Sequence, residues 1–333
     1  MMSKLENIEV IIQHSKTKNK KPIALNITQV VNSIAVTTYL EIKPGKLELS
    51  LKPLDSLEWI ALGALITVKI DEEKLFFGYV FKFDVDQDKN CTITAYDQIR
   101  YLACKDTLVT KNATASDIFK TICESYGLKY KIVAKSPHIL AKRINDNKAY
   151  ADMIAYALDK TLIDTNLWYF IRDNWGTVEF LNLYDERTNL ALGDASLVST
   201  YSYGESIDDE TYNQVKLVRE NKETKKREIY IQKDSTTIND WGTLQFFETV
   251  QESMNDAQIK QRAATLLEYY NKPKKTFKLG TCLGDFRMKA GRSFVVLLEN
   301  LKTVAPYNQY MICSSCTHKI TNGVHLMELE VLI

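Results

Sequence analysis

The sequence predicts a mainly β protein of the α+β class, in which two β-rich thirds flank a smaller α+β module. Three observations lead to this prediction. Residues 7–96 consist of short apolar or alternating runs separated by turn-like breaks, which is the pattern of antiparallel strands. Residues 106–206 add two amphipathic helical segments. Strands return after residue 207, interrupted by one further helix.

The first β-rich third, residues 1–105, contains six runs suited to strands. They read NIEVII, IALNIT, KLELSLKP, LITVKI, KLFFGYVFKF and CTITAY. Six or seven short strands at spacings of about ten residues are typical of a closed antiparallel barrel or a sandwich. Four lysines lie in an expected loop, where a solvated hairpin end is a better interpretation than a phosphate-binding patch. They are Lys16, Lys18, Lys20 and Lys21.

The middle module, residues 106–206, begins with a capping box at Thr114-Ala-Ser-Asp117, whose two ends satisfy orphan amides of a helix. The apolar stripe of this helix consists of Ile118, Phe119, Ile122, Cys123 and Tyr126. Gly127 is placed to end it, and Cys123 is interpreted as a core residue. A second helix is expected over 149–163, and LWYFIRDNWGTVEFLNL then reads as strand, turn and strand.

Four aromatic residues of this module allow two interpretations. They are Trp168, Tyr169, Phe170 and Trp175. Such a group could form a sugar-binding platform if the tryptophans were exposed to solvent. Aromatic residues in alternating strands more often lie in a core or a subunit interface, and we favour this interpretation.

The last third, residues 207–333, starts with a hairpin over 211–233, in which NQVKLVRE and REIYIQKD flank a charged turn. Whether this hairpin completes the first or the second β domain is open. A helix is expected over 253–271, beginning at the capping-box sequence Ser253-Met-Asn-Asp256. Its predicted buried side is Ile259, Ala263, Leu266 and Tyr270. Strands end the chain.

Charge and composition exclude several classes of partner. The 43 basic and 42 acidic residues leave a net charge of +1, so no long-range field attracts nucleic acid or an anionic membrane. The N-terminus lacks the apolar region of a signal peptide, and no stretch is long and apolar enough to span a bilayer. We therefore expect synthesis in the cytosol without Sec export, and neither membrane insertion nor specific nucleic-acid binding. The six cysteines are expected to be free thiols.

The segment MICSSCTHKITNGVHLM carries a Cys-x-x-Cys pair, Cys313 and Cys316. If this segment is an extended strand, the two side chains point to opposite faces and their Cα atoms lie about 10 Å apart. A disulfide needs less than about 7 Å, so none is expected.

A two-residue turn at Asn322-Gly323 would pair His318 with Met327 and Ile320 with His325. Cys316, His318 and His325 would then share a face. Three ligands leave zinc open, but an ordinary hairpin is the preferred interpretation, because no second Cys pair follows.

Catalytic signatures are weak throughout the chain. The acidic run Asp208-Asp209-Glu210 could supply two carboxylates for glycoside hydrolysis, but adjacent acids before a strand usually form a solvated turn. Cys316 and His318 lie along one strand without a third orienting group, and no phosphate-binding loop, H-E-x-x-H motif or nucleophile elbow is present. We predict no catalytic, cofactor-binding or metal-binding residue, no cofactor and no enzymatic activity.

Four stretches in a fixed order carry a family resemblance. They are KLFFGYVFKF, ITAYDQIRYLACKDTLVTKNATASDIFKTICESYGL, YGESIDDETYNQVKLV and CTHKITNGVHLMELEVL. From about residue 7 to its end, the chain resembles the hub proteins of contractile phage tails, especially the PBSX-like prophage type. The wider group includes phage late control D proteins and the hub half of type VI secretion spike proteins. The resemblance implies two antiparallel tube-like β-barrels flanking the α+β domain.

The resemblance also implies a mechanical role. A structural baseplate hub joins the six-fold tail tube to a three-fold spike around a central channel. The implied partners are two further copies in a homotrimer, a separate spike protein, a tail tube or tube-initiator protein and other baseplate proteins. The protein would be made in the cytoplasm of a bacterial host and assembled into the baseplate of a virion or a tail-like particle. Both a phage and a bacteriocin stay open. The family's Thr-His near the last hairpin is Thr317-His318 here, which implies an architectural role.

Two alternatives to the hub are a cell-wall glycan-binding module and a peptidoglycan hydrolase of a tail tip. In a trimeric hub, contacts between copies should use strands that are apolar on both faces, and residues 76–83 and 293–301 are candidates. Equally, one face of either strand could pack under a helix or under the middle domain.

Overall fold

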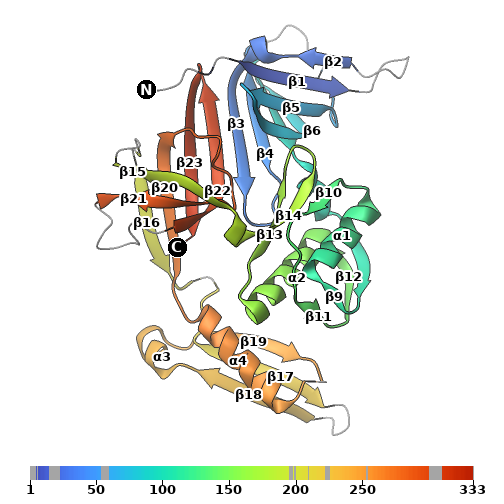
Figure 1. Cartoon of the computed structure of the whole chain (residues 1–333), viewed down its shortest axis with the longest axis vertical. Helices are drawn as coiled ribbons and strands as arrows, with labels where there is room; N and C mark the ends of the chain where they lie inside the picture. The colour runs from blue at the N-terminus through green and yellow to red at the C-terminus, as the bar shows by residue number, and fades with distance from the viewer. Residues whose placement is uncertain are drawn as a thin grey trace. The chain divides into compact units, whose positions relative to one another are not determined.

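The computed structural model describes most of the chain. Its described residues are 5, 7–14, 23–53, 60–194, 198, 200–208, 210–221, 226–252, 254–299 and 310–332. Contacts divide the chain into two compact units (Figure 1). Unit 1 comprises Met1–Ser202 and Phe277–Ile333, and unit 2 comprises Tyr203–Thr276. The predicted last third, 207–333, is therefore shared between both units.

A sheet of 13 strands dominates the β structure. The strands from the first third are β1 (Ile8–His14), β2 (Ile23–Asn26), β3 (Val31–Tyr39), β4 (Lys46–Leu51), β5 (Leu65–Ile70), β6 (Glu73–Val85) and β7 (Cys91–Tyr96). The later strands are β15 (Arg187–Gly193), β16 (Tyr201–Ser206), β20 (Lys274–Leu283), β21 (Ser293–Leu297), β22 (Tyr310–Thr321) and β23 (Val324–Leu332). Their order is β16-β20-β23-β22-β3-β4-β7-β6-β5-β1-β2, with β21 joining β22 and β15.

The mainly β, α+β class is confirmed, but the described strands do not close into two barrels. The reason lies at β3, which pairs with β4 on one side and with β22 on the other, from Ser33↔Thr321 to Tyr39↔Ser315. The edge on which a first barrel would close is thus occupied by a strand from the last third. Strands from both β-rich thirds, joined by β15 and β16, therefore form one continuous sheet, while the three strands of the last third between residues 214 and 250 form a separate one.

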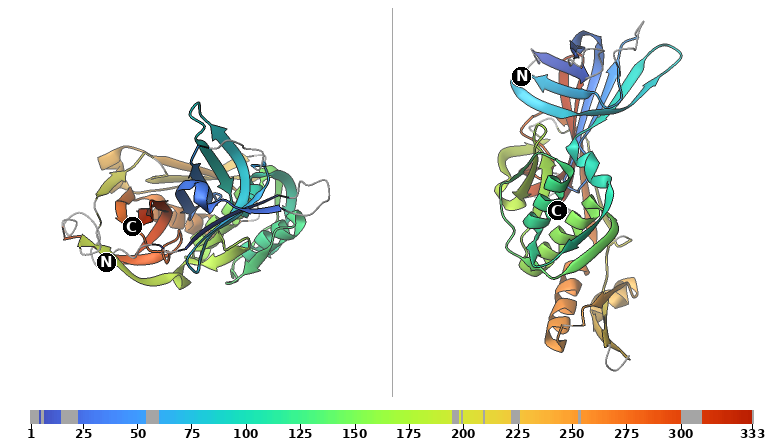
Figure 2. Two further views of the ribbon diagram at one scale, coloured as in Figure 1. Left: turned by 90° about the horizontal axis from the view of Figure 1, so that it is seen from above. Right: turned by 90° about the vertical axis from the view of Figure 1, so that its right-hand side faces the viewer.

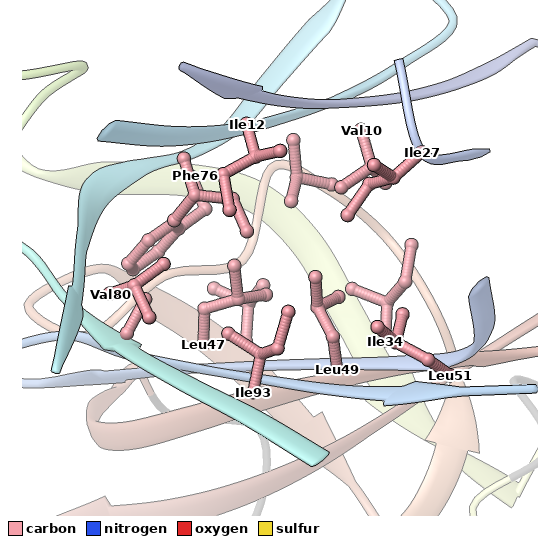
Figure 3. Close-up of a cluster of buried hydrophobic side chains, with 14 of the residues drawn as sticks. Val10, Ile12, Ile27, Ile34, Leu47, Leu49, Leu51, Phe76, Val80 and Ile93 are labelled. Carbon is pink, nitrogen blue, oxygen red and sulfur yellow. The ribbon is translucent and has the colours of Figure 1, made fainter. Parts of the chain in front are cut away.

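Alternating apolar residues explain why these segments are strands. In β5, Ile66, Val68 and Ile70 are fully buried, while the intervening residues are half-buried. Side chains from β1, β3, β4, β6 and β7 point into the same core (Figure 3). Gly78 in β6 is required by a close approach, because a Cβ atom there would lie 2.3 Å from the backbone oxygen of Tyr96.

The α+β module contains two helices and short strands. They are β8 (Lys105–Thr110), β9 (Ala113–Thr114), α1 (Ala115–Tyr126), β10 (Tyr130–Ile132), β11 (Ile139–Leu140), β12 (Arg143–Ala149), α2 (Tyr150–Thr165), β13 (Tyr169–Asp173) and β14 (Val178–Asn182). Three short 3₁₀ helices of unit 1 are Thr28–Val30, Gln98–Ala103 and Leu183–Asp185. The predicted capping box of α1 is present, and Gly127 ends the helix at φ 69°. The two helices, drawn in green, pack on each other over the sheet β10-β14-β13 (Figure 2).

Unit 2 is a three-stranded sheet covered on one face by a helix. Its elements are β17 (Gln214–Asn221), β18 (Lys226–Lys233), α3 (Ser235–Trp241), β19 (Gln245–Val250) and α4 (Asp256–Tyr270). The hairpin predicted over 211–233 forms from β17 and β18, but it pairs with β19 and not with the large sheet. The cap of α4 is Asn255 with Gln258, two residues after the predicted Ser253, which lies outside the described residues.

The predicted buried side of α4 is confirmed at Ile259, Ala263 and Leu266. Tyr270 is half-buried and stacks on Phe246 at 5.2 Å. No helix among the described residues is long and apolar enough to cross a membrane.

Candidate functional site

The cysteine–histidine segment is an antiparallel hairpin of β22 and β23. Its register pairs His318 with Met327 and Ile320 with His325, as the Asn322-Gly323 turn predicts. Both turn residues have positive φ, at 52° and 76°.

The prediction that Cys313 and Cys316 point to opposite faces is wrong. A β-bulge between Cys313 and Ser315 inserts one residue, so both thiols turn inward and are fully buried. Burial, followed by the neighbouring Cys313 thiol, raises the pKa of Cys316 well above its usual value. All six cysteines are free thiols.

Two histidines form a chain of hydrogen bonds inside the hairpin. His318 Nε2 lies 2.9 Å from the carbonyl oxygen of Met288, which can only accept, so Nε2 carries the proton. His318 Nδ1 then accepts from His325 Nε2, at 2.9 Å. Phe286 stacks on the His325 ring at 4.1 Å. Burial lowers the pKa of each histidine to about 4, so both are neutral at pH 7.

This arrangement differs from a zinc site. Both ring nitrogens of His318 are used in hydrogen bonds to Met288 and His325, which leaves no lone pair for a metal. In the part of the chain that the structure describes, no group of three His, Cys, Asp or Glu side chains is placed to hold a metal ion. Thr317, next to His318, bonds to Thr37 of β3 at 3.0 Å and so links the two halves of the sheet.

A second polar cluster lies where the α+β module meets the sheet, and we call it the polar junction: Gly45, Asp97, Gln98, Asp173 and Gly176. Asp97 caps the 3₁₀ helix by accepting from the Ile99 amide, at 3.0 Å, and its other oxygen accepts from the Gly45 amide, at 2.8 Å. A Cβ atom on Gly45 would lie 2.5 Å from that oxygen. Gln98 donates to the carbonyl of Gly176.

Two buried carboxyl groups of the polar junction are close enough to affect each other. Asp173 Oδ1 accepts from the Gly176 amide at 2.8 Å, but Oδ2 is buried and has no hydrogen-bond partner among the described residues. Burial raises the pKa of Asp173 to about 6. Burial, and then the charge of Asp173, raises the pKa of Asp97 well above its usual value. The pair therefore favours holding at least one proton near neutral pH.

A cavity of about 40 Å³ lies beside these carboxyl groups. Its lining includes Asp97, Asp173, Phe77, Lys289 and His318. Burial, and then the nearby arginines, lowers the pKa of Lys289. This volume has room for a water molecule but is far below the roughly 300 Å³ of a small-molecule site. The cavity therefore does not suit a bound metabolite.

The polar junction could not be predicted from sequence patterns. Asp173-Asn174-Trp175-Gly176 reads as an ordinary turn with Asp in its first position. Asp97 lies 76 residues earlier and has no pattern that would pair it with this turn.

The predicted aromatic residues lie mostly in the interior. Tyr169 and Phe170 are buried, and Trp168 packs against a hydrophobic cluster that includes Phe170. Trp175 is half-buried against Phe77 at 5.7 Å, with Lys69 and Lys74 over its ring. Neither tryptophan is exposed as a sugar platform requires.

The first candidate interface strand, 76–83, uses its two faces differently. Phe76, Gly78 and Val80 face the core of the sheet. The alternate residues, Phe77, Tyr79 and Phe81, are half-buried and contact Trp175, Tyr101 and Tyr96. One end of this face thus packs against the middle module, through Phe77 and Trp175, as the alternative interpretation expects.

The second candidate, 293–301, is described up to residue 299. Phe294, Val296 and Leu298 are buried, and the strand pairs on both sides, with β15 and β22. Of the acidic run, Asp208 and Glu210 are exposed, and Asp209 lies outside the described residues, as do the four loop lysines. Glu210 lies 3.7 Å from Lys274.

Comparisons with known proteins find phage-tail proteins among the chain's relatives and structural neighbours. The phage-like element PBSX protein XkdQ of Bacillus subtilis (strain 168) is 27% identical over 276 residues, which cover 82% of each chain. The 43 kDa tail protein of prophage MuSo2 from Shewanella oneidensis has a similar structure, with a TM-score of 0.68 at 13% identity, covering 97% of this chain and 98% of that one.

A third similar protein is E. coli c3393, which is described as a type VI secretion component with structural similarity to phage T4 tail proteins gp27 and gp5. The TM-score is 0.53 at 9% identity, covering 91% of this chain and 73% of that one. At 13% and 9% identity, the similarity of these two solved structures to the chain shows a shared fold. A family model described as YQBQ-like matches residues 34–332, nearly the whole sequence. The chain therefore belongs to the YQBQ-like family.

Proposed function

We propose that this protein is the structural baseplate hub of a contractile tail or tail-like particle. The observation that carries the proposal is the full-length structural likeness to a prophage tail protein, which leaves no large part of either chain unmatched. The family membership and the likeness to a PBSX protein support it independently. In this role the chain joins a six-fold tail tube to a three-fold spike around a central channel.

The continuous sheet suits such an adaptor. Each chain contributes two β-rich segments that are linked side by side through β3 and β22. Three chains then supply six such segments, which can match a six-fold tube while the assembly keeps three-fold symmetry. We infer a homotrimer in the particle, with each chain forming one third of a ring.

The partners follow from the same proposal. The E. coli protein is described as similar to both gp27 and gp5, and we assign this chain to the part of such an assembly that receives a spike. A separate spike protein, a tail tube or tube-initiator protein and other baseplate proteins are the expected neighbours. The protein would act after assembly into the particle.

We infer a role without catalysis. The buried carboxyl groups of the polar junction border a cavity of about 40 Å³, too small for a glycan or a peptide. The aromatic residues that a glycan-binding module would need are half-buried or buried. Neither feature favours a hydrolase or a cell-wall binding module.

Electron microscopy of purified particles, with the chain located by a tag, tests the proposal. We expect three copies around the tail axis, between tube and spike. Six copies, or a position outside the axial ring, would refute the hub. A monomer in dilute solution is compatible with it, because the ring can form on contact with the spike or tube.

A further inference from the structure

Unit 2 has an unusual sheet face, which we call the open face: Lys216, Val218, Ile229, Ile231 and Phe247. Val218 at its centre is buried by its neighbours and Lys216 is half-buried, while the other three residues are exposed. The register places these residues side by side, since Lys216 pairs with Ile231 on β18 and with Phe247 on β19, and Val218 pairs with Ile229. Ile229, Ile231 and Phe247 are 55%, 53% and 55% exposed. An outward sheet face normally carries polar side chains, so three large apolar residues in adjacent positions need an explanation.

The opposite face of the same sheet is already complete. Val215 and Leu217 are fully buried there, and α4 packs on β17 and β18 (Figure 1). Two ion pairs fasten the helix to the strands, Arg219 to Asp256 at 2.7 Å and Arg262 to Glu248 at 2.9 Å. The apolar residues of the open face are therefore not needed for the packing of α4.

The charges around the open face are mainly positive. Lys216 lies within it, and Lys233 follows at its end, paired in register with Gln214. Neither lysine forms an ion pair with a carboxylate in the part of the chain that the structure describes. Arg227 and Glu220 at the other end neutralise each other at 2.9 Å. An apolar centre with unpaired lysines is complementary to an apolar surface that is bordered by carboxylates.

Other classes of ligand fit less well. Single-stranded nucleic acid stacks its bases on several aromatic rings, and Phe247 is the one aromatic residue of the open face. Membrane surfaces usually bind amphipathic helices that lie within the interface, whereas this face is a sheet.

We propose that the open face docks another protein whose contact surface has an apolar centre and an acidic rim. Ile231 and Phe247 supply the buried contact, with the aliphatic stem of Lys216 between them. Lys216 and Lys233 pair with carboxylates of the partner. The inference does not depend on the hub role, because it rests on unit 2 alone.

The test uses a defined probe and the full chain. A fluorescein-labelled helical peptide carries a leucine stripe flanked by glutamates, and a matched peptide carries lysines in place of the glutamates. Fluorescence anisotropy should show the glutamate peptide binding at least about tenfold more tightly. Salt at about 0.5 M should reduce this preference, because the charged rim is exposed.

Variants locate the binding to the open face. Ile231→Ser with Phe247→Ser should weaken binding of the glutamate peptide by about tenfold. Gln232→Ser is the matched control. Gln232 is exposed and adjacent to Ile231 on the same strand, but its side chain lies on the other face of the sheet. This variant should bind the peptide like the wild type. Lys216→Glu with Lys233→Glu should reverse the preference toward the lysine peptide. Circular dichroism checks that each variant is folded.

Three results would overturn the proposal. The first is equal binding of both peptides, or of neither, by the wild type. The second is unchanged binding by the Ile231→Ser/Phe247→Ser chain. The third is that the wild type binds anionic phospholipid vesicles but neither peptide, and that the double substitution abolishes the vesicle binding. This result would assign the open face to a lipid surface.

Discussion

Individual buried ionisable residues carry the most specific chemistry of this chain. Asp173 is half-buried beside Asp97, but its Oδ2 atom is buried and lacks a hydrogen-bond partner among the described residues. The neutral form of Asp173 is therefore favoured by the fold, and its pKa is raised from 3.8 to about 6. A raised carboxyl pKa lowers stability at neutral pH and restores it as the pH falls below about 6.

Asp173→Asn should therefore stabilise the protein at pH 7. The amide keeps the acceptor for the Gly176 amide and removes a poorly solvated charge. We expect the free energy of unfolding at pH 7 to rise by about 1–3 kcal/mol, with a smaller difference at pH 4, where Asp173 is already protonated. Urea denaturation at both pH values measures this. Destabilisation at pH 7 would mean that the carboxylate has a bound cation or other partner.

Lowering the pH should destabilise the protein through the histidine pair, whereas it stabilises the protein through Asp173. His318 and His325 have pKa values of about 4, below the usual 6.5, because burial disfavours the charged form. Their contribution to stability is complete above about pH 6.5 and is lost as the pH falls toward 4. One added proton still allows a bond between the rings, since either ring can then donate. With a second proton, both facing nitrogens, His318 Nδ1 and His325 Nε2, carry hydrogen, so the hydrogen bond between the rings is lost.

This prediction is best tested in an Asp173→Asn chain, which removes the opposing effect of the carboxyl group. Between pH 7 and pH 4 the free energy of unfolding of this chain should fall. The fall should be about 2–3 kcal/mol larger than in the same chain with His325→Gln added. Denaturation at intermediate pH values measures the difference. Identical pH profiles would show that the pair does not stay neutral in the fold. Histidine proton shifts provide an independent readout.

At the scale of elements, local patterns predicted much and long-range pairing little. Alternation predicted β5 and β6, and the Asn322-Gly323 turn predicted the register of β22 with β23, because both depend on neighbouring residues. The bulge at Cys313 could not be predicted, since a bulge adds one residue without a characteristic sequence. The polar junction could not be predicted either, because its carboxyl groups come from segments that are far apart in the sequence.

The pairing of β3 with β22 shows this limit most clearly. The hydroxyl groups of Thr37 and Thr317 form a hydrogen bond, although the two residues are 280 positions apart in the sequence. Each third has the alternation of a closed barrel, and only the partner of β3 distinguishes a closed barrel from a continuous sheet. That partner lies at the other end of the chain.

At the scale of the whole molecule, the hydrophobic clusters follow the division into two units. The large core clusters around Leu47, Phe119 and Phe170 contain no residue of unit 2. They do contain residues from both ends of the chain, such as Val10 and Ile320 in one cluster. Unit 1 is thus closed by its C-terminal strands, while unit 2 is an insertion between Ser202 and Phe277.

Removing unit 2 should therefore leave unit 1 folded. The rings of Tyr201 and Phe277 lie 6.4 Å apart, so a short glycine linker can join the two cut ends. We expect the shortened chain to unfold cooperatively, with a midpoint within about 4 °C of the corresponding transition of the full chain in calorimetry. The matched control is residues 1–105 alone, which should not fold, because β3 would lose its pairing with β22 and expose an edge. Aggregation of the shortened chain, or a cooperative transition of the 1–105 fragment, would contradict this division, because the continuous sheet requires both ends of the chain and not the inserted unit.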